Sequence, residues 1–159
     1  MDLSQYCTKE SSEEGSWLDI LDFDFETPIG AKILVLGPDS REAVRMADDE
    51  EREAQKRLAD MFAGAKKKGA SEAEQESGEE KAVSKAVKLT KDWKEISLGD
   101  KVFEFNEKNA RWLYENSPHI RGQVLGFYQR RANFIKAGSD SSKKPSETRS
   151  GSTTRARGA

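Results

Sequence analysis

The residue types that most often carry catalysis or bind metals are rare in this chain. His119 is its one histidine and Cys7 its one cysteine, and they lie far apart in the sequence. A cysteine nucleophile needs a nearby base, and a metal site needs about three or four converging ligands, so these two residues supply neither. Because His119 follows Pro118 at a predicted helix start, we expect a structural or exposed role for it. We therefore predict no catalytic residue, no metal site and no cofactor, and hence a protein that is not an enzyme.

Two charged segments could bind ions or nucleic acid, but their residue patterns favour other roles. The acidic run from Asp48 to Glu53 lies in a predicted helix, where consecutive side chains point in different directions, and it lacks calcium-loop spacing. We interpret it as a solvated helix face. The basic residues from Lys143 to Arg157 lack the interleaved aromatic rings that stack on bases. Nucleic acid is therefore not an expected partner, although a small nucleic-acid-binding regulator stays an alternative.

The composition is poor in core-forming residues for a chain of 159 residues. Only 35% of the residues are hydrophobic and 35% are charged, and the mean hydropathy is -0.86. Part of the chain is therefore expected to be disordered or to become ordered with partners. Residues 1–65 hold 16 acidic and 7 basic side chains, whereas residues 138–159 hold 2 and 5. A single cysteine and the lack of a long apolar run predict a soluble, cytoplasmic protein with no membrane partner.

The first half of the chain has the pattern of a β-hairpin followed by a helix. Apolar and acidic residues alternate in the later part of 17–25, which predicts a strand, and a β-branched run over 31–37 predicts its partner. Asp39 is the expected N-cap of the next helix, with Glu42 three residues on. A narrow apolar stripe runs along this helix, and its residues are Val44, Ala47, Ala54, Leu58, Met61 and Phe62. The stripe is too small to hold a lone helix, so we expect it to pack on the hairpin or on another copy.

The second half predicts a short hairpin and two helices. A strand–turn–strand pattern is centred on Gly99. Asn106 is the expected cap of one helix, and Ser117 with Pro118 begins the next, which we expect to end near Gly138. The side chains of this last helix that are expected to point inward are Ile120, Val124, Leu125, Phe127, Tyr128 and Ile135.

Together these patterns predict an α+β, mainly helical fold. Its parts are a flexible N-terminus (1–16), a hairpin and helix (17–63), a flexible linker or frayed helix extension (64–80), a helical part with a short hairpin (81–137) and a disordered basic tail (138–159). Apolar and aromatic side chains on the helices are either core residues or interface anchors, and spacing does not divide the two roles. The candidate interface residues are Val44, Ala47, Leu58, Met61, Phe62, Trp112, Leu113, Tyr114, Ile120, Val124, Phe127 and Tyr128.

Two stretches of the sequence resemble the tail assembly chaperones of long-tailed bacteriophages. The first, F-D-F-E-T-P-I-G-A-K-I-L-V-L-G-P-D-S-R-E (23–42), is similar to the family's strand, turn and strand with a G-x-D-S start of a helix. The second, D-W-K-E-I-S-L-G-D-K-V-F-E-F-N-E-K-N-A-R-W-L-Y-E-N-S-P-H-I-R-G-Q-V (92–124), is similar to a recurrent aromatic run of the family that ends in P-x-I-R-x-Q-V. Family members often carry Thr or Ser followed by Pro where this chain has Asn106 and Glu107, a difference that affects the helix cap.

The resemblance implies a carrier for a long client protein. Tail assembly chaperones hold the tape-measure protein in a soluble state inside the infected cell while tail-tube subunits polymerise around it, and they leave before the virion is finished. The tape-measure protein and the tail-tube protein are thus the implied partners, a homo-oligomer is implied as well, and the implied location is the host cytoplasm. The alternative is a structural virion component, such as a tail or head-tail connector subunit.

Many members of this family are also made in a longer form by ribosomal frameshifting near the end of the reading frame. An A-rich slippery run could encode Lys143 and Lys144, which makes such a longer form a hypothesis for this chain. The coding DNA tests it, because a gene without a slippery heptamer at these codons would exclude this site.

Overall fold

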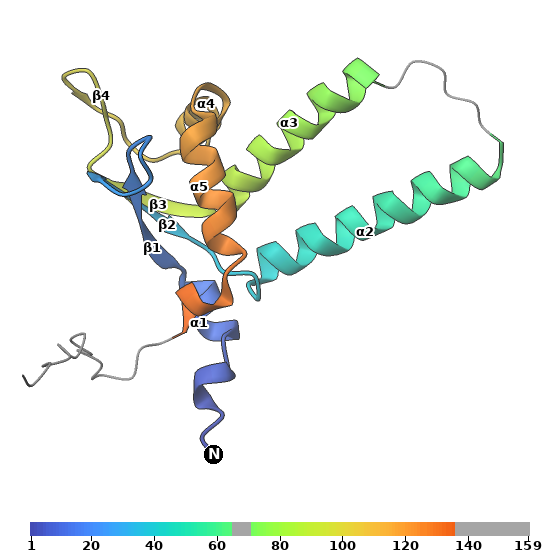
Figure 1. Ribbon diagram of the computed structural model, residues 1–159, viewed down its shortest axis with the longest axis horizontal. Coiled ribbons are helices and arrows are strands. Elements are labelled where there is room, and N and C mark those ends of the chain that lie inside the picture. Colours follow the sequence, from blue (N-terminus) through green and yellow to red (C-terminus); the bar gives the residue numbers. More distant parts are fainter. Residues whose placement is uncertain (65–70, 136–159) are drawn as a thin grey trace, which may run out of the picture.

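The protein is mainly helical, with a small antiparallel sheet at its centre. The computed structural model describes residues 1–64 and 71–135 (Figure 1). It confirms the α+β, mainly helical class expected from the sequence. In chain order the elements, with η for a 3-10 helix, are η1 (Ser4–Tyr6), α1 (Lys9–Glu14), β1 (Ser16–Leu21), β2 (Pro28–Val35), α2 (Arg41–Phe62), α3 (Ser71–Leu89), β3 (Thr90–Lys94), β4 (Ser97–Leu98), β5 (Lys101–Val102), α4 (Glu107–Asn116), α5 (Pro118–Tyr128) and η2 (Arg131–Phe134).

Strand β2 is the centre of a three-stranded antiparallel sheet with the order β1-β2-β3. β1 pairs with it as the predicted first hairpin, with Leu18 opposite Ile33. On the other side of β2, Ile33 lies opposite Trp93 of β3. Ile33 and Val35 are fully buried while Lys32 is exposed, so the alternation of the strand turns one face to the core. Because β3 comes from the predicted part 81–137, the two halves of the chain share one sheet.

Both predicted hairpins are shorter than the sequence indicated. β1 ends at Leu21, and Phe23 and Phe25 lie in the following turn with 79% and 62% of their surface exposed. The alternation of apolar and acidic residues there belongs to a turn, because Asp24 accepts hydrogen bonds from the Thr27 N–H at 2.9 Å and from the Thr27 hydroxyl at 2.6 Å. The later hairpin is limited to the two short strands β4 and β5.

The N-cap of α2 is Ser40 rather than the predicted Asp39. The Ser40 hydroxyl accepts a hydrogen bond from Ala43 N at 3.3 Å. The Asp39 carboxylate instead accepts hydrogen bonds from the Arg131 guanidinium, at 3.0 Å from Nη2, and from the Thr8 hydroxyl. Arg131, and after it Thr8, hold the pKa of Asp39 below its usual range. One carboxylate thereby ties α2 to the segments before β1 and after α5.

The two other predicted caps are confirmed, but the last helix is shorter than expected. The side chains of Asn106 and Ser117 accept hydrogen bonds from the backbone N–H three residues on, at 2.7 Å and 3.5 Å. α5 ends at Tyr128 and is followed by η2. Ile135, which we expected to point inward, is 42% exposed, and Phe134 is buried in its place. The change to a 3-10 turn therefore rotates the neighbouring side chain into the core.

The N-terminal residues 1–16, predicted to be flexible, contain η1 and α1. Ser12 in α1 is fully buried, and its carbonyl oxygen accepts a hydrogen bond from the Gly37 N–H at 2.9 Å. This contact was not predictable from the residue pattern, because α1 is short and polar, and a polar pattern of this kind indicates an exposed segment. The N-terminal segment is therefore part of the packed structure.

The predicted linker 64–80 is partly helical, since α3 begins at Ser71. Of the two alternatives that the sequence left open for this segment, a flexible linker or a frayed helix extension, the structure is closer to the helix extension. Residues 65–70 and the basic tail predicted to be disordered (138–159) lie outside the described residues.

One hydrophobic core joins the sheet to α3, α4 and α5. Its buried members are Ile20, Ala31, Ile33, Val35, Ala43, Met46, Val83, Ala86, Leu89, Trp93, Ala110, Leu113, Tyr114 and Val124. Tyr114 is completely buried, and burial raises its pKa to about 12. The Thr90 hydroxyl donates to Ala86 O at 2.8 Å, which leaves its oxygen free to accept from the Tyr114 hydroxyl. The Thr90 and Tyr114 hydroxyls are thus both satisfied by hydrogen bonds.

The contact between Gly37 and α1 predicts a clear effect on stability. A Cβ added at Gly37 would lie 2.6 Å from Ser12 Cβ and 2.8 Å from Ser12 Cα, so the backbone would have to move. We expect Gly37→Ala to lower the free energy of unfolding by about 1–3 kcal/mol. Gly78→Ala is the control, because a Cβ on this α3 residue meets nothing within 4 Å and should raise stability by about 0.5–1 kcal/mol. Urea denaturation followed by circular dichroism measures both, and equal stabilities would contradict the packing of α1.

Candidate protein-interaction site

Helix α2 extends away from the sheet as a long, highly charged helix (Figure 1). Of its 22 residues, Ala43 and Met46 are buried, and every residue from Ala47 to Phe62 is exposed. A helix of this length gains most of its stability from packing one face. Since none of the residues that the structure describes buries a face of the last four turns of α2, these turns are candidates for contact with another molecule.

The apolar side chains of α2 are exposed along its length. Val44 is 47% exposed, Leu58 53%, Met61 74% and Phe62 90%. Together with Ala47 and Ala54, which are also exposed, they form the stripe predicted from the sequence, here called the α2 ridge. In the described part of the chain the hairpin does not cover the ridge, so the first of the two expected covers is excluded, and packing on another copy stays a prediction. Exposed apolar side chains that lie in a row commonly mark a protein-binding surface.

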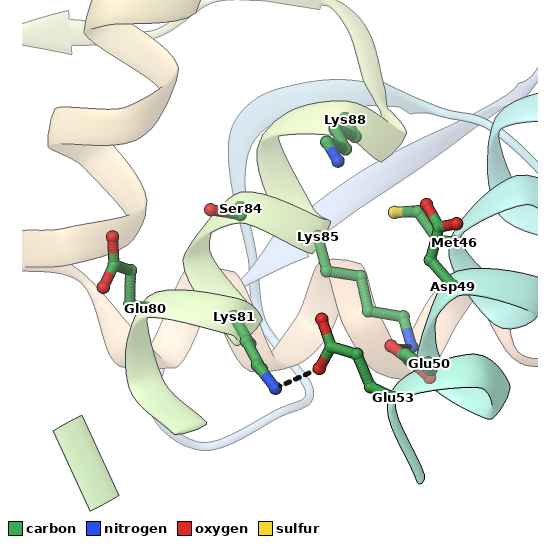
Figure 2. A pocket seen from close by; sticks show the side chains of 9 residues that line it. All are labelled: Met46, Asp49, Glu50, Glu53, Glu80, Lys81, Ser84, Lys85 and Lys88. Atoms are coloured by element: carbon green, nitrogen blue, oxygen red, sulfur yellow. Dashed lines mark hydrogen bonds and ion pairs between the residues drawn. The ribbon is translucent and has the colours of Figure 1, made fainter. Parts of the chain in front are cut away.

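A charged groove separates α2 from α3 (Figure 2). It has a volume of about 360 Å³, and its walls consist of Met46, Asp49, Glu50, Glu53, Glu80, Lys81, Ser84, Lys85 and Lys88. Lys81 of α3 reaches across to Glu53 at 2.6 Å, and Lys85 reaches Glu50 at 3.0 Å. In Figure 2 both lysine chains extend from α3 toward carboxylates on α2. Ion pairs rather than apolar packing therefore hold the middle of α2 beside α3.

These ion pairs shift the pKa values of Glu53 and Lys85 in the groove. The hydrogen bond and charge of Lys81 keep the pKa of Glu53 below its usual value. Burial opposes the charge of Lys85, but hydrogen bonds with Tyr128 and Glu50 outweigh this and raise its pKa. The Lys85 ammonium also lies 5.3 Å from the centre of the Tyr128 ring. These shifts keep Glu53 ionised and Lys85 protonated near neutral pH, so the groove can bind and position a partner through charge.

The second group of candidate interface residues, on α4 and α5, is mostly part of the core. Leu113, Tyr114 and Val124 are buried. Ile120, Phe127 and Tyr128 are partly buried and pack against the same core. Trp112 alone in this group is an exposed large side chain, with 45% of its surface accessible, and it contacts the Phe103 ring edge to face at 5.6 Å. The structure therefore brings the α2 residues together on one surface but does not add the α4 and α5 residues to it.

The residues that sequence reasoning missed are the lysines that hold α2. Lys81 and Lys85 are four residues apart on α3, which places them on one face of that helix. This spacing was visible in the sequence, but their partners Glu50 and Glu53 lie beyond a connection whose path the sequence does not define. His119 lies near the start of α5, and its Nε2 is 3.0 Å from Leu21 O.

Comparisons of the chain with protein-family models, with curated proteins and with solved structures gave no match. Within the two described ranges, none of the helices combines the length and the apolar character that crossing a bilayer requires. The role of the α2 surface is therefore inferred from its residues and their geometry.

The ion pairs across the groove predict that salt loosens α2. Both carboxylates are more than half exposed, so their pairs are screened at high ionic strength. We expect hydrogen exchange at residues 47–62 to be faster in 1 M salt than in 0.05 M salt, and the variant Lys81→Ala Lys85→Ala to show the faster exchange already at low salt. Mass-spectrometric hydrogen exchange measures this.

Strands β1 and β2 serve as the internal control for this experiment, since their exchange is expected to change little. Equal exchange of α2 at both salt concentrations would mean that contacts other than the ion pairs hold the helix.

Proposed function

We propose that this chain is a bacteriophage tail assembly chaperone, which binds the tape-measure protein in the host cytoplasm, keeps it soluble and helps to recruit tail-tube subunits. The observation that carries the proposal is the exposed α2 ridge on a helix that is otherwise charged. The resemblance of 23–42 and 92–124 to that family supplies the identity of the client. The ridge supplies a physical means of binding it.

A tape-measure protein is a very long helical chain with exposed apolar stripes. An amphipathic client helix can lay its apolar stripe along the α2 ridge, as helices do in helix-in-groove recognition. The charged faces of α2 then point to solvent and keep the complex soluble, since 12 of its 22 residues are Asp, Glu, Lys or Arg. Many copies bound along one client add up to stable coverage although each contact is weak.

In this proposal the chain acts by binding and release, without catalysis. Release before the virion is complete requires contacts that tail-tube subunits can displace, and exposed side chains on a single helix meet this need because they bury little area each. A chaperone of this kind is absent from the mature virion. A structural virion component would be retained, so the content of purified virions separates the two functions.

Co-expression with the tape-measure protein from the same genome tests the proposal. We expect the client to stay soluble and to co-purify with this chain. The variant Leu58→Glu Phe62→Glu should reduce the co-purified client by at least about tenfold, because it places two charges where an apolar stripe must dock. Both side chains are exposed, so the fold should be retained, and circular dichroism checks this.

The matched control is Leu98→Glu Val102→Glu on the β4–β5 hairpin, which also replaces two exposed apolar side chains and should leave client binding unchanged. A client that precipitates with the unmodified chain, combined with the presence of the chain in purified virions, would favour the structural virion component.

A further inference from the structure

An apolar groove lies between α5 and the first hairpin, and it shares no residue with the α2 ridge. Its volume is about 650 Å³. Six residues from β1, the following turn and α5 form the apolar part of its lining: Leu18, Leu21, Phe25, Gly122, Gly126 and Phe127. This surface is called the α5 groove, and it is separate from the surface that the proposed function assigns to the client.

The walls of the α5 groove are joined to each other by internal contacts. The Gln123 side chain of α5 accepts a hydrogen bond from Leu21 N and donates one to Leu21 O, both at 2.9 Å. The Phe25 ring lies 4.9 Å from the His119 ring. Phe25 also has a left-handed backbone with φ 57°, which is unfavourable for a bulky residue and marks a constrained position. The groove is therefore formed before a partner arrives, which lowers the entropic cost of binding.

The two ends of the groove carry opposite charges. Beyond the C-terminal end of α5 the groove is lined by the exposed Arg130, and no aspartate or glutamate occurs among the described residues that line it. The turn after β1 lies beside His119, near the N-terminal end of α5. Exposed carboxylates of Asp22, Asp24 and Glu26 surround this end, and none of them forms an ion pair within the described ranges.

This charge distribution matches that of an α-helix lying antiparallel to α5. Acidic side chains are favoured in the first turn of a helix and basic ones in the last turn, because of the helix dipole. In the antiparallel direction the first turn of such a helix meets Arg130, and its last turn meets the acidic turn after β1. The 11 residues of α5 span roughly 16 Å at 1.5 Å per residue, which corresponds to three turns of the bound helix.

We propose that the α5 groove binds an amphipathic helix of another protein, one with an acidic first turn, an apolar stripe of about three turns and a basic last turn. The two glycines of α5 fit this use. Glycine is less favourable than alanine inside a helix, and a Cβ at Gly122 or Gly126 would meet nothing within 4 Å, so packing among the described residues does not require them. Their exposed backbone allows a second helix to approach closely.

The chain's own C-terminal residues do not have the composition to fill the groove. In residues 138–159 the apolar side chains, apart from Pro145, are Ala156 and Ala159. The segment also carries 5 basic and 2 acidic side chains, so Arg130 would repel it. A groove lined by leucine and phenylalanine requires larger apolar side chains than this segment provides.

A second copy of the chain does not supply the required helix either. Among the helices that the structure describes, α1, α2 and α4 have no basic residue in the last turn, and α5 has no acidic residue in the first turn. Helix α3 ends with Lys88, but its apolar side chains Val83 and Leu89 are buried in the core. The occupant is therefore a helix of another protein.

Two synthetic peptides of about 16 residues test the contact with the full chain. The first has two glutamates in its first turn, a stripe of alanine and leucine, two lysines in its last turn and glutamine elsewhere. The second has the glutamates and lysines exchanged. Fluorescence anisotropy should show saturable binding of the first peptide and at least about tenfold weaker binding of the second.

The variant Arg130→Glu should weaken the first peptide and strengthen the second, because it reverses the charge at one end of the groove. Each peptide is compared with itself on the two proteins, so a difference in helix content between the peptides does not affect the result. Lys101→Glu is the matched control, since it makes the same change in net charge on the exposed β5 and should alter neither affinity. Absence of saturable binding of the first peptide, or unchanged affinities in Arg130→Glu, would overturn the proposal.

Filling the groove gives an independent test. Gly126→Leu places a side chain in the groove, removes a helix-interior glycine and should abolish binding of the first peptide while the protein stays folded. Gly78→Leu is the matched control, because this helical glycine is also exposed and open, and it should bind normally. Unchanged peptide binding by Gly126→Leu would overturn the proposal. Self-association of the unmodified chain that is lost in Gly126→Leu would also overturn it, since the groove would then hold a second copy.

The groove contact goes beyond the proposed function and does not rest on it. The variant Leu58→Glu Phe62→Glu of the α2 ridge should bind the first peptide as the unmodified chain does, even though it loses the client. Loss of the peptide in this variant would place the peptide on the ridge and overturn the proposal. Failure of the chain to bind the tape-measure protein would contradict the proposed function and leave the expected peptide binding unchanged.

Discussion

The pairing of β2 with β3 is the contact on which the rest of the structure depends. It places Ile33 opposite Trp93 and Val35 opposite Thr90, although the whole of α2 and α3 lies between these strands in the sequence. Closing so long a connection is entropically unfavourable and must be offset by the buried side chains of the sheet. Because the two strands are neighbours, α2 leaves the core and α3 returns to it at nearly the same place (Figure 1).

The pairing of β2 with β3 therefore fixes the base of α2 and α3 at the sheet, whereas the outer parts of these two helices are held more loosely. At the base, the Leu36 N–H donates to Leu89 O at 2.8 Å, and Thr90 joins the buried Tyr114 hydroxyl to the last turn of α3. Farther out, α2 is held beside α3 by exposed ion pairs, which solvent and salt screen and which therefore contribute little to stability. The part of α2 that carries the exposed apolar side chains is thus the part that can adapt its position to a partner.

Local signals in the sequence were enough for some features and not for others. Asn106 and Ser117 were predictable as caps because a cap depends on residues within one helical turn. Asp39 was assigned the cap of α2, one residue early, because its distant partner Arg131 is not visible in the local pattern. Phe25 was assigned to a strand because alternation of apolar and acidic residues also arises in a turn closed by an aspartate. In each error a contact or a turn outside the local pattern decided the outcome.

The candidate interaction site likewise has one part that the local sequence pattern predicted and one part that it did not. The α2 ridge was predictable because its residues share one helix and one period, but its exposure depends on where the sheet directs the helix. The apolar groove between α5 and the turn that joins β1 to β2 was not predictable, because its walls come from β1, the following turn and α5, which meet only in the folded chain. Gly122 and Gly126 were visible in the sequence, yet only the structure shows that a Cβ at either position would meet no atom of the described residues within 4 Å.

The size of the α2 ridge also limits how tightly this surface can hold a partner. Stable complexes bury about 800 Å² on each partner, whereas a single row of six apolar side chains along about five helical turns, roughly 27 Å at 1.5 Å per residue, offers less. A single ridge contact is therefore weak and reversible, and appreciable binding requires several copies acting together. For a carrier that must cover a long client and later leave it, weak individual contacts are a requirement, because tighter ones would oppose release. In the proposed role the same argument fits a ridge that is narrow and interrupted by Glu51 instead of a continuous apolar stripe: a wider stripe would bind more tightly but would also promote aggregation of the free protein.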